Sequence, residues 1–369
     1  MSRRASSRPA VTQARALACA QKFEEGVDQG GSNSIMASVR PALASNNRTG
    51  SYGVAVMELR VQPDFRSYER RGRGERRGWS LDGFEFYSTG HSFHRFMNPT
   101  NIDKLMELGW ACGLELRQGA PEAWRLANIN DGLFPDAAVT RSATGVEKRV
   151  LDVGCGKGGL TFLLVENFLA RCLGVDLSPG EIRQAEARRR LSAFANKVLF
   201  VRADGREHTR ALASKGDRFD VALCIGATFI FGSFEDTIEA LGSCLADGGV
   251  LAIGEATLNE CEGTQAYRDE VASEIVLRTD SELLETIERN GYDLTYMVEA
   301  SLPDWDRYES LQWLALHRNL ALHPDDPEAR AHWERKHKEK VSYLSRERRY
   351  IGWKVFVLER AVAGTRLTT

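Results

Sequence analysis

The chain has 369 residues, a formal net charge of −2 and a hydrophobic content of 43%, which suits one large domain with additions or two domains. Its longest apolar runs have the length of a strand and fall short of the roughly 20 residues of a bilayer helix, so we expect no membrane span. Its seven scattered cysteines form neither a CxxC pair nor a cysteine–histidine cluster. This argues against a metal site and favours a reducing, cytoplasmic environment.

Charge is divided unevenly along the chain. Residues 1–80 contain 14 Lys and Arg against 7 Asp and Glu, which leaves −9 for the remainder. We interpret 1–80 as a basic, flexible extension, because its composition is poor in core-forming residues. Residues 1–22 lack acids and resemble an organelle-targeting peptide in composition, but we favour a cytoplasmic protein. The acidic body argues against a nucleic-acid substrate, because binding phosphates requires a basic face.

Residues 81–148 are expected to form an ordered lead-in followed by an insertion. Aromatic side chains surround His91 and His94, and a helical pattern follows Pro99. The turn-rich stretch 118–147 then precedes the first clear strand, which is typical of a surface insertion or a functional loop.

From residue 149 to 301, strand and helix patterns alternate. This alternation predicts a parallel sheet that is covered by helices on both faces. A helix beginning at Thr279 or Asp280 precedes the last part of the sheet. Strands are predicted at 149–153, 172–177, 198–202, 220–225, 250–255, 293–299 and 354–359.

Residues 302–350 separate the last two predicted strands. They carry several Trp and Tyr residues in a charged helical pattern, including Trp305, Tyr308, Trp313, Trp333 and Tyr343. A fold without an insertion would have a short hairpin here, so we expect a helical cap. Residues 351–369 then hold the last core strand and a tail.

A glycine-rich loop follows the first predicted strand, in the run 150–159 with the sequence VLDVGCGKGG. Glycines permit positive φ and let a ligand lie directly on the main chain, and the following helix offers unpaired N–H groups to it. Because Gly154, Gly156 and Gly159 also satisfy the dinucleotide fingerprint, the loop alone does not distinguish between cofactors.

Three acids lie where strands end. Asp152 precedes the first glycine, where dinucleotide enzymes carry an apolar residue, and it can reach the loop or a cationic aminoacyl group. Asp176 ends the second strand, in position to accept hydrogen bonds from ribose hydroxyls. Asp204 ends the third strand, in position to meet an adenine amine. Together with the late strand pair, this pattern resembles class I S-adenosylmethionine (SAM)-dependent methyltransferases over 149–360. The runs 91–99, 224–228 and 349–353 resemble a bacterial small-molecule subgroup among them.

The resemblance implies a doubly wound, mostly parallel, seven-stranded Rossmann-like α/β sheet, with a SAM-binding core over 149–301 and a last strand, within 351–369, that inserts antiparallel. SAM would lie across the carboxyl ends of the strands. The residues expected to border it are Asp152, Gly154, Cys155, Gly156, Gly158, Asp176, Leu177, Asp204, Gly205, Cys224, Ile225 and Gly226.

Methyl transfer from a sulfonium is an in-line displacement, and a nucleophile with a dissociable proton requires a nearby base. Glu255, at the end of the fifth strand, is the first candidate, and His91 and His94 are the others. A capped site favours a small-molecule acceptor. The alternatives are an NAD-dependent oxidoreductase and a non-catalytic binding module acting through its arginine-rich tail. Nothing in the sequence indicates the oligomeric state.

Overall fold

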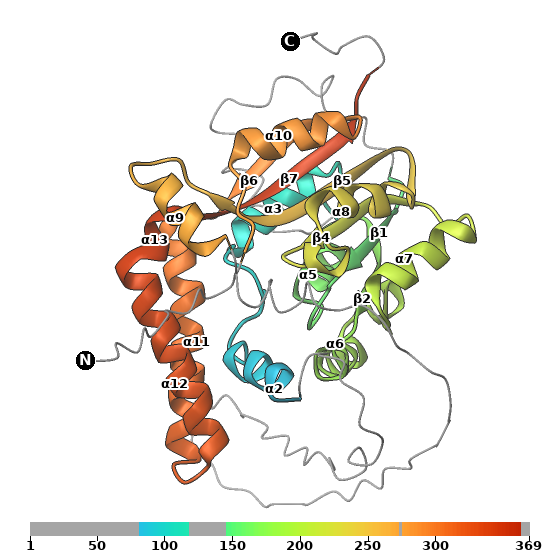
Figure 1. Ribbon diagram of the computed structural model, residues 1–369. Coiled ribbons are helices and arrows are strands. Elements are labelled where there is room, and N and C mark those ends of the chain that lie inside the picture. Colours follow the sequence, from blue (N-terminus) through green and yellow to red (C-terminus); the bar gives the residue numbers. More distant parts are fainter. Residues whose placement is uncertain (1–80, 118–144, 273–274, 363–369) are drawn as a thin grey trace, which may run out of the picture. The chain divides into compact units, whose positions relative to one another are not determined.

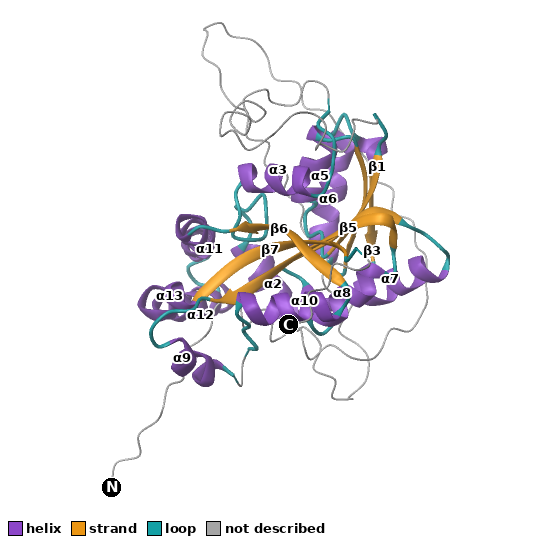
Figure 2. Ribbon diagram, turned by 90° about the horizontal axis from the view of Figure 1, so that it is seen from above, coloured by secondary structure: helices purple, strands orange, loops and turns teal. Residues whose placement is uncertain are grey.

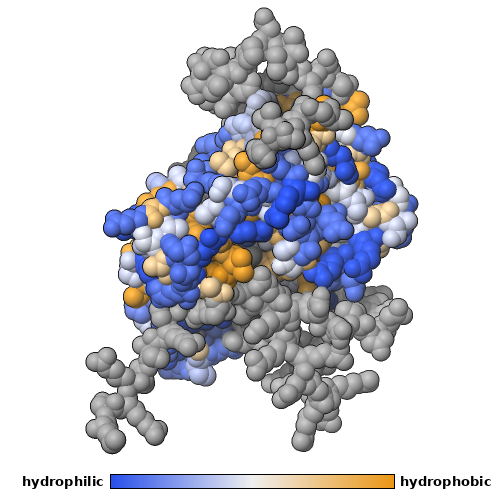
Figure 3. Space-filling model, turned by 45° about the horizontal axis from the view of Figure 1, so that its top comes forward, coloured by the Kyte–Doolittle hydropathy of each residue, from blue (hydrophilic) through white to orange (hydrophobic). Residues whose placement is uncertain are grey.

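The computed structural model describes residues 81–117, 145–272 and 275–362 (Figure 1). The expected extension 1–80 and most of the insertion 118–147 lie outside the described residues. Within the described part of the chain, no helix is long and apolar enough to cross a membrane. The described surface seen in Figure 3 is mostly hydrophilic, with apolar residues in small patches.

A single seven-stranded sheet organises the described residues, with the strand order β3-β2-β1-β4-β5-β7-β6. Neighbouring strands from β3 to β5 pair in parallel, whereas β7 pairs antiparallel with both β5 and β6. The predicted sheet with its antiparallel last strand is therefore confirmed. The strands are β1 (Lys148–Val153), β2 (Ala170–Asp176), β3 (Val198–Arg202), β4 (Phe219–Ile225), β5 (Leu245–Leu258), β6 (Tyr292–Glu299) and β7 (Ile351–Arg360).

Helices cover both faces of the sheet (Figure 2). Successive residues of a strand point to opposite faces of the sheet. Val150 therefore belongs to the apolar cluster on one face, and Leu151 belongs to the apolar cluster on the other. The first face carries α3 (Ile102–Ala111), α5 (Gly159–Asn167) and α6 (Pro179–Leu191); the second carries α7 (Gly205–Ser214), α8 (Phe234–Gly242) and α10 (Asp280–Arg289).

Capping residues fix where two of these helices begin. Ser178 caps α6 by accepting from the backbone N–H of Glu181, and Pro179 occupies the first helical position, which suits its fixed φ. Thr279 and Glu282 form a capping box at α10, which satisfies two N–H groups that a helix start leaves free. The start of α10 agrees with the sequence prediction.

Strand β5 is longer than predicted at both ends. Its first residues include Asp247 and Gly248, and Gly248 has a φ of +67°. Phe219 of β4 pairs with Leu245, but Val221, two residues later, pairs with Val250, so three extra residues of β5 form an irregularity within the strand. At the other end, pairing with β7 continues to Leu258. Glu255 therefore lies inside the strand and does not close it.

The residues between β6 and β7 form two long helices, α11 (Leu302–Leu322) and α12 (Pro327–Ser342), and the short α13 (Arg348–Tyr350). In Figure 1, α11 and α12 run side by side. Their facing sides bury an ion-pair cluster. The Lys336 ammonium lies 3.0 Å from Glu309 and 3.3 Å from Glu339. Helix α2 (Leu81–Gly90) packs against α11, where Gly90 lies beside Leu316. The lead-in is thereby joined to the cap.

Candidate functional site

The glycine loop turns the chain sharply between β1 and α5. Gly154, Gly156 and Gly158 have φ values of +78°, +52° and +71°, which side chains other than glycine rarely adopt. Their surroundings differ. A Cβ at Gly158 would strike the Phe200 ring, and the Cys155 side chain is buried in the core. Gly158 is thus required for packing against β3, and only the backbone of Cys155 is available to a ligand.

Asp176 at the end of β2 holds the loop in place. Its Oδ2 accepts from the backbone N–H of Gly156 at 2.8 Å, and its Oδ1 accepts from Ser178 at 2.8 Å. Burial raises the pKa of this carboxyl, while these backbone donors oppose the rise. Each carboxylate oxygen has further acceptor capacity, so a diol placed beside the loop can donate to Asp176 as well.

Asp152 makes a contact that the sequence did not predict. It is 3% exposed, and its Oδ2 accepts from the Thr161 hydroxyl at 2.7 Å. Burial raises its pKa to about 6. The side chain thus ties β1 to α5 beneath the loop, and this internal contact accounts for an acid at a position that is often apolar.

The other predicted cofactor residues lie at the same edge of the sheet. Asp204 caps α7 by accepting from the Glu207 N–H at 3.0 Å, and Gly205 packs against Val153, where a Cβ would be 2.7 Å from a methyl carbon. Leu177 is half-buried after Asp176. After β4, Cys224 and Ile225 are buried, and Gly226 turns the chain with a φ of +80°.

The segment that follows β4 connects the loop to β5 and β7. Ala227 fills the space where Gly154 would carry a Cβ, and a Cβ at Gly226 would lie 2.8 Å from the Trp353 ring. The Thr228 hydroxyl donates to Glu255 at 2.6 Å. These contacts place the glycine loop, the end of β4 and the start of β7 next to one another.

Glu255 lies on the face of the sheet that carries α8 and α10, because it alternates with Ile253, a member of that apolar cluster. Burial raises its pKa, and the Thr228 hydroxyl and the charge of Arg278 oppose the rise.

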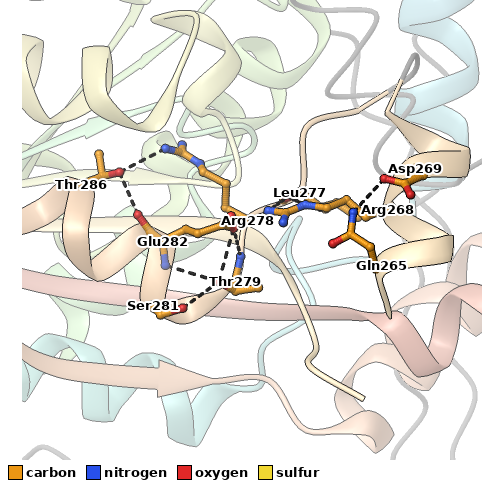
Figure 4. A network of polar contacts seen from close by, with 9 residues as sticks. All are labelled: Gln265, Arg268, Asp269, Leu277, Arg278, Thr279, Ser281, Glu282 and Thr286. Atoms are coloured by element: carbon orange, nitrogen blue, oxygen red, sulfur yellow. Dashed lines mark hydrogen bonds and ion pairs between the residues drawn. The ribbon is translucent and has the colours of Figure 1, made fainter. Parts of the chain in front are cut away.

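Arg278 also belongs to a polar network, which Figure 4 shows. Its guanidinium lies 3.5 Å from the Thr286 hydroxyl. The same network anchors α9 (Thr264–Val271) to the start of α10, because Arg268 pairs with Glu282.

His91 has both ring nitrogens engaged. Its Nδ1 lies 2.8 Å from the Tyr87 carbonyl and its Nε2 lies 2.7 Å from the Tyr308 hydroxyl. Since a carbonyl only accepts, Nδ1 carries the proton and Nε2 accepts from Tyr308. Burial holds the pKa of His91 well below its usual value. A base needs an accessible lone pair, so this arrangement argues against the catalytic role predicted for His91.

His94 has one nitrogen engaged. Its Nε2 donates to the Tyr308 carbonyl at 3.0 Å, and its Nδ1 has no hydrogen-bond partner among the residues that the structure describes. The side chain is 6% exposed, and burial lowers its pKa to about 4. His94 is therefore neutral near pH 7 and presents a lone pair in desolvated surroundings.

The lead-in lies directly on the glycine loop. Lys157, within the loop, donates to the His91 carbonyl at 2.6 Å, and Met97 would be 2.8 Å from a Cβ at Gly156. The Arg95 carbonyl fills the space beside Gly159. Sequence reasoning did not assign Lys157 a role, although its place inside the loop was a signal. It also assigned no role in the site to Tyr308, which contacts His91 and His94, or to Trp353, which lies beside Gly226.

The described residues contain no group of three or more His, Cys, Asp or Glu side chains that could hold a metal ion.

Comparisons with known proteins agree with this geometry. A family described as a methyltransferase domain matches residues 145–301. The chain is 32% identical to the Escherichia coli protein YjhP over 215 residues. This match covers 57% of this chain and 84% of YjhP. A SAM-dependent methyltransferase from Geobacter sulfurreducens, solved with S-adenosylhomocysteine (SAH), matches with a TM-score of 0.61 and 29% identity, over 75% of this chain and 98% of that one. The X-ray structure of YjhP matches with a TM-score of 0.57 and 26% identity, over 75% of this chain and 100% of that one.

The residues around the loop fit SAM. Gly156 turns the main chain at the edge of the sheet with a φ of +52°, and Asp176 retains acceptor capacity for ribose hydroxyls. Asp204 stands at the end of the next strand, and the end of β4 borders the loop through Ala227. The chain belongs to the class I S-adenosylmethionine-dependent methyltransferases, and S-adenosylmethionine is its cofactor.

Proposed function

We propose that this enzyme transfers the methyl group of SAM to a small-molecule acceptor at the carboxyl end of its sheet. The observation that carries the proposal is the cover over the glycine loop: residues 91–97 lie on the loop and contact α11 through His91 and His94. A covered site suits a small molecule better than a polymer. The net charge of −9 outside residues 1–80 also argues against a nucleic-acid acceptor.

Within this proposal, the backbone at Gly154 and Gly156 approaches the aminoacyl part of SAM. Asp176 accepts from the ribose hydroxyls and Asp204 from the adenine amine, while the segment from Gly226 borders the transferred methyl group. The chain's contribution to the rate is to hold the nucleophile about 3 Å from the methyl carbon and to exclude water, because an in-line displacement needs no covalent intermediate.

Two groups remain candidates for the base. Glu255 is a carboxylate with a raised pKa beside Thr228, and His94 is a neutral imidazole with an unpaired nitrogen. They lie on opposite faces of the sheet, since His94 contacts Tyr308 of the cluster that packs against the other face.

The test is incubation of the purified protein with methyl-labelled SAM and fractionated small-molecule extract. Label recovered in a small molecule, with equimolar SAH, would support the proposal. Label recovered only in protein or nucleic acid would contradict it.

A further inference from the structure

A continuous run of aromatic rings extends from the lead-in to strand β7 of the sheet. The His94 ring lies 4.8 Å from the Tyr308 ring, Tyr308 lies 6.0 Å from Trp305, and Trp305 lies 6.4 Å from Trp353. Trp305 and Tyr308 are three residues apart on α11 and thus share a face. We call these four residues the aromatic run.

The two ends of the aromatic run meet the two segments that border the cofactor. His94 belongs to the segment that lies on the glycine loop, because Arg95 and Met97 fill the space beside Gly159 and Gly156. Trp353 packs against Gly226, directly after β4. An acceptor that contacts the aromatic run would therefore lie between these segments, next to the methyl group of SAM.

Three polar atoms of the aromatic run have no hydrogen-bond partner in the described part of the chain: the indole Nε1 atoms of Trp305 and Trp353, and Nδ1 of His94. The three side chains are 6%, 0% and 6% exposed. Buried polar atoms are normally paired, because an unpaired one loses its hydrogen bonds to water without compensation. Three such atoms on contiguous rings point to a ligand.

The chemistry of these atoms defines what the ligand carries. An indole N–H only donates, and Nδ1 of His94 only accepts, because the Nε2–H donates to the Tyr308 carbonyl. The complementary ligand offers an acceptor oxygen to the indoles and an O–H to the imidazole. The rings favour a planar, aromatic body, since aromatic pairs gain from stacked and edge-to-face contacts.

Building on the proposed function, we propose that the acceptor is a small aromatic molecule with a hydroxyl group, and that Nδ1 of His94 receives the hydroxyl proton during O-methylation. The oxygen–methyl bond forms as the sulfonium–methyl bond breaks, the sulfur keeps the electron pair, and SAH leaves. The proton moves from the oxygen to His94 and then to solvent. Charge and atoms balance without a further reactant.

The first experiment compares acceptors of similar skeleton. The full-length protein is given labelled SAM with p-cresol or naphthol, and with methylcyclohexanol, p-toluate or p-toluidine in parallel. We expect label in the two phenols at a rate at least about tenfold above the other three compounds, in line with a loss of one or two hydrogen bonds or ring contacts. SAM binding is measured on the same sample by calorimetry. Intact SAM binding without transfer to either phenol would overturn this inference alone, whereas absent SAM binding would overturn the proposed function.

The second experiment tests His94 with a readout that a structural role would not move. His94→Asn keeps an oxygen acceptor close to the Nδ1 position but cannot take a proton. With p-cresol, kcat should fall about 10²- to 10⁴-fold, as expected for lost base catalysis. With p-nitrophenol in mildly alkaline buffer, the acceptor is already ionised, and the loss should be less than about tenfold. An equal loss with both phenols would overturn the role of His94.

The indoles are tested by Trp305→Phe and Trp353→Phe, which remove the N–H and keep an aromatic ring. Each should raise KM for p-cresol about three- to tenfold, which corresponds to one neutral hydrogen bond. Trp333→Phe is the matched control, because Trp333 stacks on His337 of α12 and is outside the aromatic run. An equal change in KM in all three variants would contradict the assignment.

Discussion

The cofactor side of the site and the side on which we propose that the acceptor binds, called the acceptor side below, are built in different ways. The cofactor side is a local structure: β1, the glycine loop, α5 and β2 follow one another in the chain, and Asp176 lies only 20 residues from the Gly156 N–H that it binds. The acceptor side joins residues that are far apart in sequence, such as His94, Gly226, Trp305 and Trp353. A local structure leaves a readable pattern, whereas distant residues acquire a shared role only through the fold.

The largest expected effect concerns the backbone of the cofactor side. Gly156→Val should weaken SAM binding at least about 100-fold, because a branched residue is strained at a φ of +52° and its Cβ enters the space between the loop and Met97. Gly216→Val is the matched control, since Gly216 has a φ of +79° and a Cβ there meets nothing within 4 Å. Calorimetric titration with SAM measures the affinity of both variants. Equal weakening in the two variants would mean that strain alone is responsible.

On the acceptor side, the buried His94 should make stability depend on pH. Its pKa of about 4 lies below the usual 6.5, so between these values the unfolded chain binds the proton and stability falls as pH falls. At about 1.4 kcal/mol per pKa unit, the wild type should lose up to about 3 kcal/mol of unfolding free energy between pH 7 and pH 4 through this group. His94→Gln lacks the group, so its unfolding free energy should rise by that amount relative to the wild type over the same range. Urea unfolding at a series of pH values measures this difference. A difference that does not change with pH would contradict the burial of a neutral His94. The charged and titratable groups around it are His91, Lys157, Arg307 and Lys336.

Asp176→Ala tests the hydrogen bonds of the cofactor side. Loss of a charged hydrogen-bonding group costs about 1.5–3 kcal/mol, so SAM affinity should fall roughly ten- to a hundredfold. Asp176→Asn, which keeps one oxygen for the Gly156 N–H, should lose less. If a folded Asp176→Ala protein bound SAM as tightly as the wild type, the ribose assignment would be wrong.

The smallest effect should come from Glu255. With His94 as the base, Glu255→Gln retains an acceptor for the Thr228 hydroxyl and should lower kcat less than about tenfold, while SAM affinity is unchanged. Steady-state kinetics with p-cresol measure kcat, and calorimetric titration measures the SAM affinity. A loss of about 10²- to 10⁴-fold would return the role of the base to Glu255.

The sequence predicted the sheet well because each strand and helix carries its own periodicity and its own capping residues, as Thr279 and Ser178 show. It also located the loop and Asp176. It did not predict the partner of Asp152, because the Thr161 hydroxyl reaches this carboxylate only once α5 packs onto β1. It could not separate His91 from His94, because the difference lies in which atoms of Tyr308, more than 200 residues away, each ring meets.

The central claim is that the glycine loop binds SAM, and calorimetry of the purified protein with SAM, SAH and NAD(H) tests it most directly. We predict that SAM and SAH bind at one site per chain, that Gly156→Val abolishes both titrations, and that NAD(H) gives no heat of binding. Binding of NAD(H) without binding of SAM or SAH would contradict the claim.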